Sequence, residues 1–136
     1  MVMTGATMFK VMLIAPIALL LMAADAPRKF TIAGQKFQEK DIIDARPLPD
    51  LNGTAAILLT FEDKAAKRLT KISRRNREKP VAINLDGKTL VRPIFHSPID
   101  DGMIQISGLF TLEQATQLAR RISGKDPLPD SLDEGP

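Results

Sequence analysis

The sequence predicts an α+β fold, a two-layer sandwich in which a mainly antiparallel sheet carries two main helices on one face. Short segments of alternating or continuous apolar residues recur along the chain, bounded by Gly, Pro, Asn or Asp. Two longer segments, residues 62–77 and 111–122, repeat apolar residues at helical spacing. The dipeptide Asp86-Gly87 is typical of a two-residue antiparallel hairpin.

Composition bounds the class of protein. The chain has 136 residues, which predicts a single domain, and no Cys, which excludes disulfides and thiolate chemistry. With six Phe and no Trp or Tyr, few rings are available to stack nucleic-acid bases. The formal net charge of +3 is too small to indicate a nucleic-acid partner. We expect no cofactor, no metal and no nucleic acid.

Residues 1–24 are predicted to be a signal peptide. Lys10 precedes an apolar run over residues 11–22, and small residues follow. A membrane span needs about 20 apolar residues, so this run is short for a permanent anchor. Pro16 would also kink a spanning helix. We therefore expect export to the periplasm rather than a cytosolic chain with an apolar tail.

The sequence of the leader allows more than one cleavage site and more than one start. Cleavage after Ala23 or Ala24 suits the small residues there, because Pro27 follows the neatest site at Ala26. An uncleaved leader would tether the protein to the membrane. A start at Met8 would give a more ordinary leader than a start at Met1.

The domain proper is predicted to begin with a hairpin over residues 28–38 that turns at Ala33-Gly34. Its buried face would hold Phe30, Ile32 and Phe37. Residues 39–45 are interpreted as a short helical turn, which residues 46–50 end because each Pro disfavours helix in the residue before it.

Residues 54–61 are continuously apolar, which predicts a central strand. The helix over residues 62–77 follows, with acids in its first turn and arginines in its last, as the helix dipole favours. Its stripe toward the sheet is Ala65, Leu69, Ile72 and Asn76.

A second hairpin is predicted from strand 81–85, the Asp86-Gly87 turn and a partner strand over residues 89–95. Pro93 cannot donate to a ladder, so the partner should lie at a sheet edge or bulge there. A turn at Gly102 leads into strand 103–107, which Gly108 should end.

The second helix covers residues 111–122, with Thr111 and Gln114 as a capping box and Gly124 as the stop. Its apolar face is Leu112, Ala115, Leu118, Ala119 and Ile122. Residues 125–136 are rich in Pro and acids, which predicts a disordered tail. The folded domain is thus expected over residues 28–124.

Residues 54–124 also follow a recognisable order of motifs. An apolar strand ends in Phe61, a helix ends near Asn76, and an Ala-Ile-x-Leu-Asp-Gly hairpin occupies residues 82–87. A further segment, residues 106–115, reads Ile-Ser-Gly-Leu-Phe-Thr-Leu-Glu-Gln-Ala. This order resembles the head subdomain of the first periplasmic domain of SecD/SecDF protein translocase subunits. The motif residues that match are Leu85, Asp86, Gly87, Pro93, Gly102, Ile106, Gly108 and Phe110.

The resemblance implies a non-catalytic accessory module in the cell envelope. The partners it implies are Sec translocase components or unfolded exported polypeptide. SecD-type proteins also carry transmembrane helices with ionisable residues implied in proton-coupled pulling, and this sequence offers no spanning segment beyond the leader. The resemblance therefore implies a stand-alone head module. The chain departs from the family at Ala65, where Gly is frequent, and near Glu78.

Two surfaces are candidates for binding. Arg92, Pro93, Ile94 and Phe95 could leave a sheet edge open to an extended peptide, which binds by backbone hydrogen bonds and tolerates many sequences. The alternative is that Pro and Arg guard this edge against aggregation. The second candidate is an anion-facing surface for phospholipid headgroups, formed by Lys64, Lys67, Arg68, Lys71, Arg74 and Arg75. Its alternative is a solvated helix face.

No catalytic site is predicted. His96 is the only histidine, and a hydrolytic triad or a zinc site would need ordered partners around it. Asp100 and Asp101 lie near it in the sequence, but a turn accounts for them. Neither this turn nor Asp86-Gly87 has the alternating oxygen ligands of a calcium loop.

Overall fold

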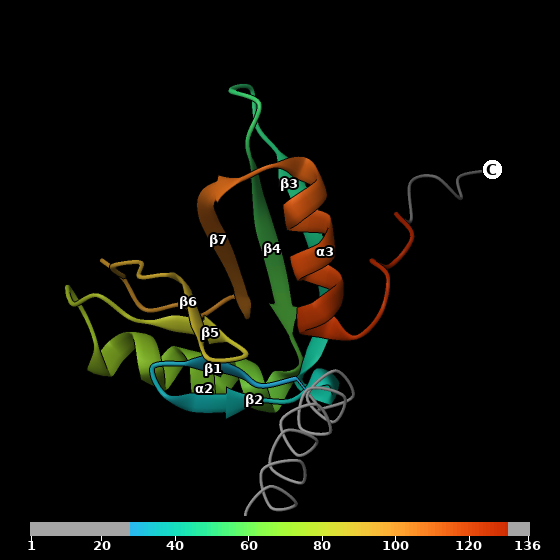
Figure 1. The fold of residues 1–136 in the computed structure, drawn as a ribbon. Coiled ribbons are helices and arrows are strands. Elements are labelled where there is room, and N and C mark those ends of the chain that lie inside the picture. The colour runs from blue at the N-terminus through green and yellow to red at the C-terminus, as the bar shows by residue number, and fades with distance from the viewer. Residues whose placement is uncertain (1–27, 131–136) are drawn as a thin grey trace, which may run out of the picture.

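The computed structural model describes residues 28–130, so the predicted signal peptide and residues 131–136 lie outside it. Its strands form two antiparallel sheets (Figure 1). The first sheet has the order β2-β1-β5-β6 and contains β1 (Phe30–Ile32), β2 (Gln35–Phe37), β5 (Ile83–Leu85) and β6 (Lys88–Val91). The second has the order β3-β4-β7 and contains β3 (Ile42–Pro49), β4 (Ala55–Phe61) and β7 (Met103–Phe110).

Two α-helices and one short 3-10 helix complete the fold. They are η1 (Glu39–Asp41), α2 (Asp63–Arg75) and α3 (Leu112–Ser123). Figure 1 shows α3 lying across the second sheet, whereas α2 runs beneath the first. None of the helices in residues 28–130 is long and apolar enough to cross a membrane.

The predicted α+β class with antiparallel pairing is confirmed. The prediction of one sheet with both helices on one face is wrong, because the strands divide into two ladders and each helix packs against its own. Apolar alternation marks a strand and its buried side, but it carries no information about which strands share hydrogen bonds. One continuous hydrophobic core nevertheless joins both sheets and both helices.

The first hairpin is confirmed. Phe30 pairs with Phe37, and Ala33 and Gly34 form the turn with φ of 53° and 77°. The side chains of Phe30, Ile32 and Phe37 are fully buried. β1 also pairs with β5 on its other side, so β1 is an inner strand of the first sheet and β2 is an edge strand.

The prediction for residues 39–50 is largely wrong. Only Glu39–Asp41 is helical, and Ile42–Pro49 is a strand that pairs with β4 along its whole length. Pro47 and Pro49 are compatible with this because β3 lies at the edge of its sheet, where a missing N–H costs no ladder bond. The prolines therefore mark an edge strand and not the end of a helix.

β4 is the central strand of the second sheet, as its continuous apolar sequence predicted. The β5–β6 hairpin is also confirmed, with φ of 52° at Asp86 and 85° at Gly87. β6 is an edge strand as expected, but it ends at Val91 and continues only as a single bridge between Pro80 and Ile94.

Gly108 does not end its strand, which is a further correction. β7 runs on to Phe110, and its pairing with β4 skips from Ala56–Ser107 to Ala55–Phe110. Gly108 and Leu109 are the extra residues of a bulge in β7. Glycine suits this position because a Cβ built on Gly108 would lie 2.8 Å from the Phe110 ring.

Both predicted helices are present. Ala65, Leu69 and Ile72 of α2 are buried as expected, and Glu62 caps the helix by accepting the Ala65 N–H at 2.6 Å. In α3 the Thr111–Gln114 capping box and the left-handed Gly124 are confirmed. Leu112 was placed on the apolar face, yet its side chain is 49% exposed because it sits in the first turn at the margin of the stripe.

Candidate functional site

The segment Arg92–Pro93–Ile94–Phe95 lies alongside residues 78–81. The Val81 N–H donates to the Pro93 carbonyl at 2.9 Å, and the Glu78 N–H donates to the Phe95 carbonyl at 3.0 Å. In this antiparallel arrangement the backbone of Ile94 faces away from residues 78–81. The segment is therefore an edge, and Ile94 offers its backbone groups outward.

The predicted basic face of α2 is separated into two parts. Lys64, Lys67, Lys71, Arg74 and Arg75 are exposed and form no ion pair within residues 28–130. Arg68 is half-buried instead: its guanidinium lies 4.2 Å from the centre of the Phe37 ring and donates to the Lys36 carbonyl at 2.7 Å. Arg68 thus joins α2 to the first sheet, and the exposed cations remain as the candidate anion-facing surface.

A groove between β7 and α3 was not predicted. It encloses about 510 Å³. Its lining residues are Leu109, Phe110, Gln114, Gln117, Leu118 and Arg121. The bulge in β7 turns Leu109 outward, so that its side chain is 94% exposed. The sequence signal was the break in alternation at Gly108-Leu109, which we had interpreted as the end of the strand.

β7 also has a free edge. It pairs with β4 on one side and has no strand partner on the other among the strands of residues 28–130. An unpaired edge presents N–H and C=O groups to an incoming strand. The strand that supplies Leu109 and Phe110 to the groove therefore also has an edge that can hydrogen-bond an extended chain.

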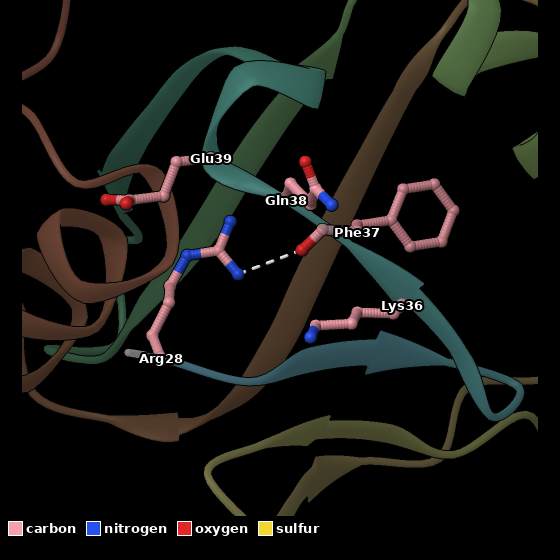
Figure 2. A pocket seen from close by; sticks show the side chains of 5 residues that line it. All are labelled: Arg28, Lys36, Phe37, Gln38 and Glu39. Atoms are coloured by element: carbon pink, nitrogen blue, oxygen red, sulfur yellow. Dashed lines mark hydrogen bonds between the residues drawn. The ribbon is translucent and has the colours of Figure 1, made fainter. Parts of the chain in front are cut away.

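A buried guanidinium lines a second hollow, of about 220 Å³, between the first hairpin and η1 (Figure 2). Arg28 donates from Nη1 to the Phe37 carbonyl at 2.9 Å, while its Nε and Nη2 have no hydrogen-bond partner in residues 28–130. Burial lowers the pKa of Arg28, and the Glu39 carboxylate partly offsets this. Since Glu39 faces the same hollow, an anion bound there would compete with the Glu39 carboxylate for the charge of Arg28.

The first part of the tail is attached to the edge strand β3, which corrects the expected disorder for residues 125–130. The Leu128 N–H donates to Asp44 Oδ1 at 2.8 Å, and Arg46 Nη2 donates to the Leu128 carbonyl at 2.8 Å. Arg46 Nη1 also contacts Asp130 Oδ1 at 2.6 Å. The composition of the tail did not indicate this attachment, because backbone groups take part in two of the three bonds and leave no signal in the side chains.

Asp44 and Arg46 are themselves paired, with Arg46 Nε 2.6 Å from Asp44 Oδ2. Burial tends to raise the pKa of Asp44, but the hydrogen bonds from Arg46 and from the Leu128 N–H outweigh it and hold the pKa below its usual value. Hydrogen bonds to Asp44 and Asp130 raise the pKa of Arg46. Both groups are thus charged at neutral pH.

The motif residues occupy structural positions. Asp86 accepts the Lys29 N–H and the Arg121 guanidinium, each at 2.9 Å. The Gly102 carbonyl accepts the Phe61 N–H at 2.8 Å. Leu85 and Ile106 lie in the core. These residues fix the turns and joins that hold the two sheets together.

His96 is exposed, and its Nδ1 lies 2.9 Å from Glu78 Oε2. Asp100 and Asp101 do not join this pair, and the Asp101 carboxylate accepts the Met103 N–H within its own turn. Within residues 28–130 no group of three or more His, Asp and Glu side chains converges as a metal site would require. The notable features of this chain are therefore surfaces and edges.

Two small antiparallel sheets joined by two helices through one core define the class of a small α+β domain. The family is more specific. The model of the SecDF P1 head subdomain matches residues 20–125, and the chain belongs to this family. The resemblance inferred from residues 54–124 is confirmed.

Curated relatives are translocase subunits. The chain is 36% identical over 90 residues to the protein translocase subunit SecDF of Thermus thermophilus, covering 65% of this chain and 12% of the relative. It is 37% identical over 79 residues to SecD of Rhodobacter capsulatus, covering 58% and 14%. The chain therefore spans only a small part of the length of the curated relatives it matches.

Solved structures agree with this. A structure of SecDF, described as a membrane component that enhances protein export, superposes with a TM-score of 0.60 at 32% identity, covering 71% of this chain and 44% of that one. A crystal structure of SecDF in a super-membrane-facing form gives a TM-score of 0.58 at 33% identity, covering 67% and 12%.

Proposed function

We propose that this protein is a periplasmic module associated with protein translocation, and that it contacts unfolded polypeptide at the groove between β7 and α3. The observation that carries this is the position of Leu109, whose side chain is 94% exposed beside the free edge of β7. An exposed apolar residue next to unpaired backbone groups suits an extended chain, because such a chain offers apolar side chains and free backbone N–H and C=O groups.

The groove supports this role better than the segment Arg92–Phe95. Pro93 lacks an N–H, and its carbonyl already accepts the Val81 N–H at 2.9 Å, so an incoming strand would find few backbone groups there. β7 has no proline, and its outer edge is unpaired among the described strands. The Arg92–Phe95 edge remains a secondary candidate, with Ile94 as its contact residue.

The setting of this module is part of the proposal. The relatives are subunits of the protein translocase, so Sec translocase components are the partners we propose, with the periplasm as the location. Residues 1–24 would serve as the signal peptide for export, and residues 28–124 as the head-like domain. We also propose a non-catalytic role, because the relatives are subunits of a protein translocase.

The test is binding of a permanently unfolded, fluorescently labelled polypeptide, measured by anisotropy. Leu109→Ser should weaken binding several-fold, because it removes apolar contact area from the groove. Leu51→Ser is the matched control, since Leu51 is a fully exposed leucine in the β3–β4 turn, outside the groove. Equal binding by the wild type and the Leu109 variant would overturn the proposed site.

A second candidate function is binding to an anionic membrane surface. The observation that favours it is the row of exposed cations on α2 that form no ion pair with any described residue, namely Lys64, Lys67, Lys71, Arg74 and Arg75. Each basic residue near such a surface contributes about 1 kcal/mol. Arg68 is excluded because Phe37 and Lys36 hold it.

Vesicle flotation tests this candidate. The chain should float with vesicles containing phosphatidylglycerol but not with neutral ones, and the binding should weaken steeply with salt. Replacing Lys64, Lys67 and Lys71 by Gln should abolish flotation, whereas Lys88→Gln and Lys125→Gln, at exposed lysines elsewhere, should not. Equal flotation with neutral and with anionic vesicles would contradict this candidate function.

A further inference from the structure

We propose that Asp44 and Arg46 form a second peptide-binding site on β3, which recognises the backbone of an extended acidic segment and is occupied by the chain's own tail. The bound segment is Leu128 to Asp130. The ligand class that the contacts define is an unfolded peptide with an acidic residue two positions after the one whose backbone is held. This site is separate from the groove between β7 and α3.

The contacts are those of a peptide recognised through its main chain. Asp44 Oδ1 accepts the Leu128 N–H and Arg46 Nη2 donates to the Leu128 carbonyl, each at 2.8 Å. The two side chains thus satisfy both backbone groups of one residue, as the opposite residue of an antiparallel strand does in a hydrogen-bonded pair. The Leu128 side chain is 46% exposed and contributes little to the recognition.

The site is held ready by its own internal bond. Arg46 Nε lies 2.6 Å from Asp44 Oδ2, so the carboxylate fixes the guanidinium plane with both Nη atoms directed at the tail. The Asp44 residue is only 8% exposed, and its side chain cannot swing freely. Fixing the recognising groups before binding reduces the entropic cost of holding a ligand.

The third contact gives a preference for acidic peptides. Arg46 Nη1 lies 2.6 Å from Asp130 Oδ1, and an arginine–carboxylate bond of this kind is stronger than a neutral hydrogen bond. The intervening residue, Pro129, makes no hydrogen bond to the site among the described contacts. A chain with other residues at the first two positions would therefore fit as well.

Attachment through the same chain explains why so few bonds keep the site occupied. A tail joined to α3 through Gly124 by a short connection has an effective concentration on the order of millimolar. A separate peptide with these contacts should bind with a Kd in the millimolar range. The tail is thus a built-in competitor, and unfolded chains rich in acidic residues would displace it by supplying several such segments.

The test uses two full-length variants that differ at one position. Leu128→Pro removes the N–H that Asp44 accepts, which should release the tail, whereas Leu128→Ala keeps this N–H and should leave the tail bound. The probe is the acetylated and amidated peptide Lys-Asp-Pro-Leu-Pro-Asp, equal to residues 125–130. Its binding is followed by amide chemical shifts of β3 in an isotopically labelled protein.

The peptide should shift the β3 amides of the Leu128→Pro variant at millimolar concentration. The wild type and the Leu128→Ala variant should require about twofold more, because a tail whose effective concentration is close to Kd about doubles the peptide concentration needed. Adding Arg46→Gln to the Leu128→Pro variant should abolish the shifts. Thermal unfolding of each variant checks that the fold is retained.

Two results would overturn the site: no β3 shifts in the Leu128→Pro variant, or shifts that persist when Arg46 is replaced. Leu109→Ser separates this proposal from the function proposed above, because it alters the groove and not β3. If Leu109→Ser leaves polypeptide binding unchanged while the β3 shifts appear, the groove proposal fails and the β3 site stands.

Discussion

The Asp86 carboxylate joins the β5–β6 turn to helix α3, with Oδ2 2.9 Å from Nε of Arg121. Its other oxygen accepts the Lys29 N–H, also at 2.9 Å, just before β1. Three segments that are distant in sequence thus meet at one side chain. Asp86 also carries a φ of 52°, so it serves the hairpin through its backbone and the tertiary fold through its carboxylate.

Asp86→Asn should lower stability by about 1 kcal/mol at pH 7, a modest value because the ion pair is partly exposed and solvent screens it. Asn tolerates the left-handed φ, so the turn is kept and the loss reports the charge. Urea unfolding measures it. Asp100→Asn is the control, since Asp100 is exposed and forms no ion pair among the described residues.

The same substitution predicts a pH dependence. The hydrogen bond from Arg121 is the largest cause that holds the pKa of Asp86 below its usual value, with the Lys29 N–H adding to it against the effect of burial. A depressed folded pKa means that the stabilisation is present above the unfolded pKa of about 3.9 and is lost as pH falls through the folded value. The difference between wild type and Asp86→Asn should therefore shrink as the pH falls below the unfolded pKa of about 3.9. A constant difference from pH 7 to pH 2.5 would contradict this.

Thr111→Ala should cost about 1 kcal/mol, because the Thr111 hydroxyl accepts the Gln114 N–H at 3.1 Å and caps α3. Thr116→Ala is the matched control within the same helix. The Thr116 hydroxyl donates to the Leu112 carbonyl at 2.7 Å. This bond satisfies no backbone group that the helix leaves without a partner, so its loss should be neutral or slightly stabilising. Equal costs for the two variants in urea unfolding would exclude the cap as the cause.

Local pattern was sufficient to predict much of the fold. Asp86-Gly87 and Ala33-Gly34 turn where the sequence indicated, and both α-helices were predicted from their apolar stripes and end signals. These features depend on residues within one turn or one hairpin of each other. Propensity and periodicity report such short-range relations well.

The relations that were missed are either edge effects or long-range contacts. β3 was mistaken for a turn because Pro47 is unfavourable in most strands, and its edge position, which removes the cost, is a property of the assembled sheet. The attachment of the tail joins Leu128 to Asp44 across 84 residues. No local pattern in either segment identifies the other as its partner.

The candidate site was missed for a related reason. Leu109 is exposed because β7 bulges against β4, and a bulge is defined by the register of two strands rather than by one of them. The sequence offered Gly108 as a signal, which fits a strand end and a bulge equally. The exposed cations of α2 share one face because helical spacing places them there, whereas Arg68 differs because it packs on Phe37 of another strand.

Gly102 and Gly53 offer a test of why glycine stands at the turn before β7. Both have left-handed backbones, with φ of 71° and 84°. A Cβ on Gly102 would lie 3.1 Å from the Ala66 Cβ on α2, whereas a Cβ on Gly53 would meet nothing within 4 Å. The carbonyl of Gly102 also accepts the Phe61 N–H at 2.8 Å, so the turn cannot move away without loosening that bond.

Alanine at either position should cost about 1 to 2 kcal/mol for the left-handed conformation. Gly102→Ala should cost at least about 1 kcal/mol more than Gly53→Ala, because the added methyl overpacks against α2. Urea unfolding of both variants, with the slope unchanged, measures the difference directly. Equal losses would mean that Gly102 is required only for its φ, and that α2 and the turn before β7 have room to separate.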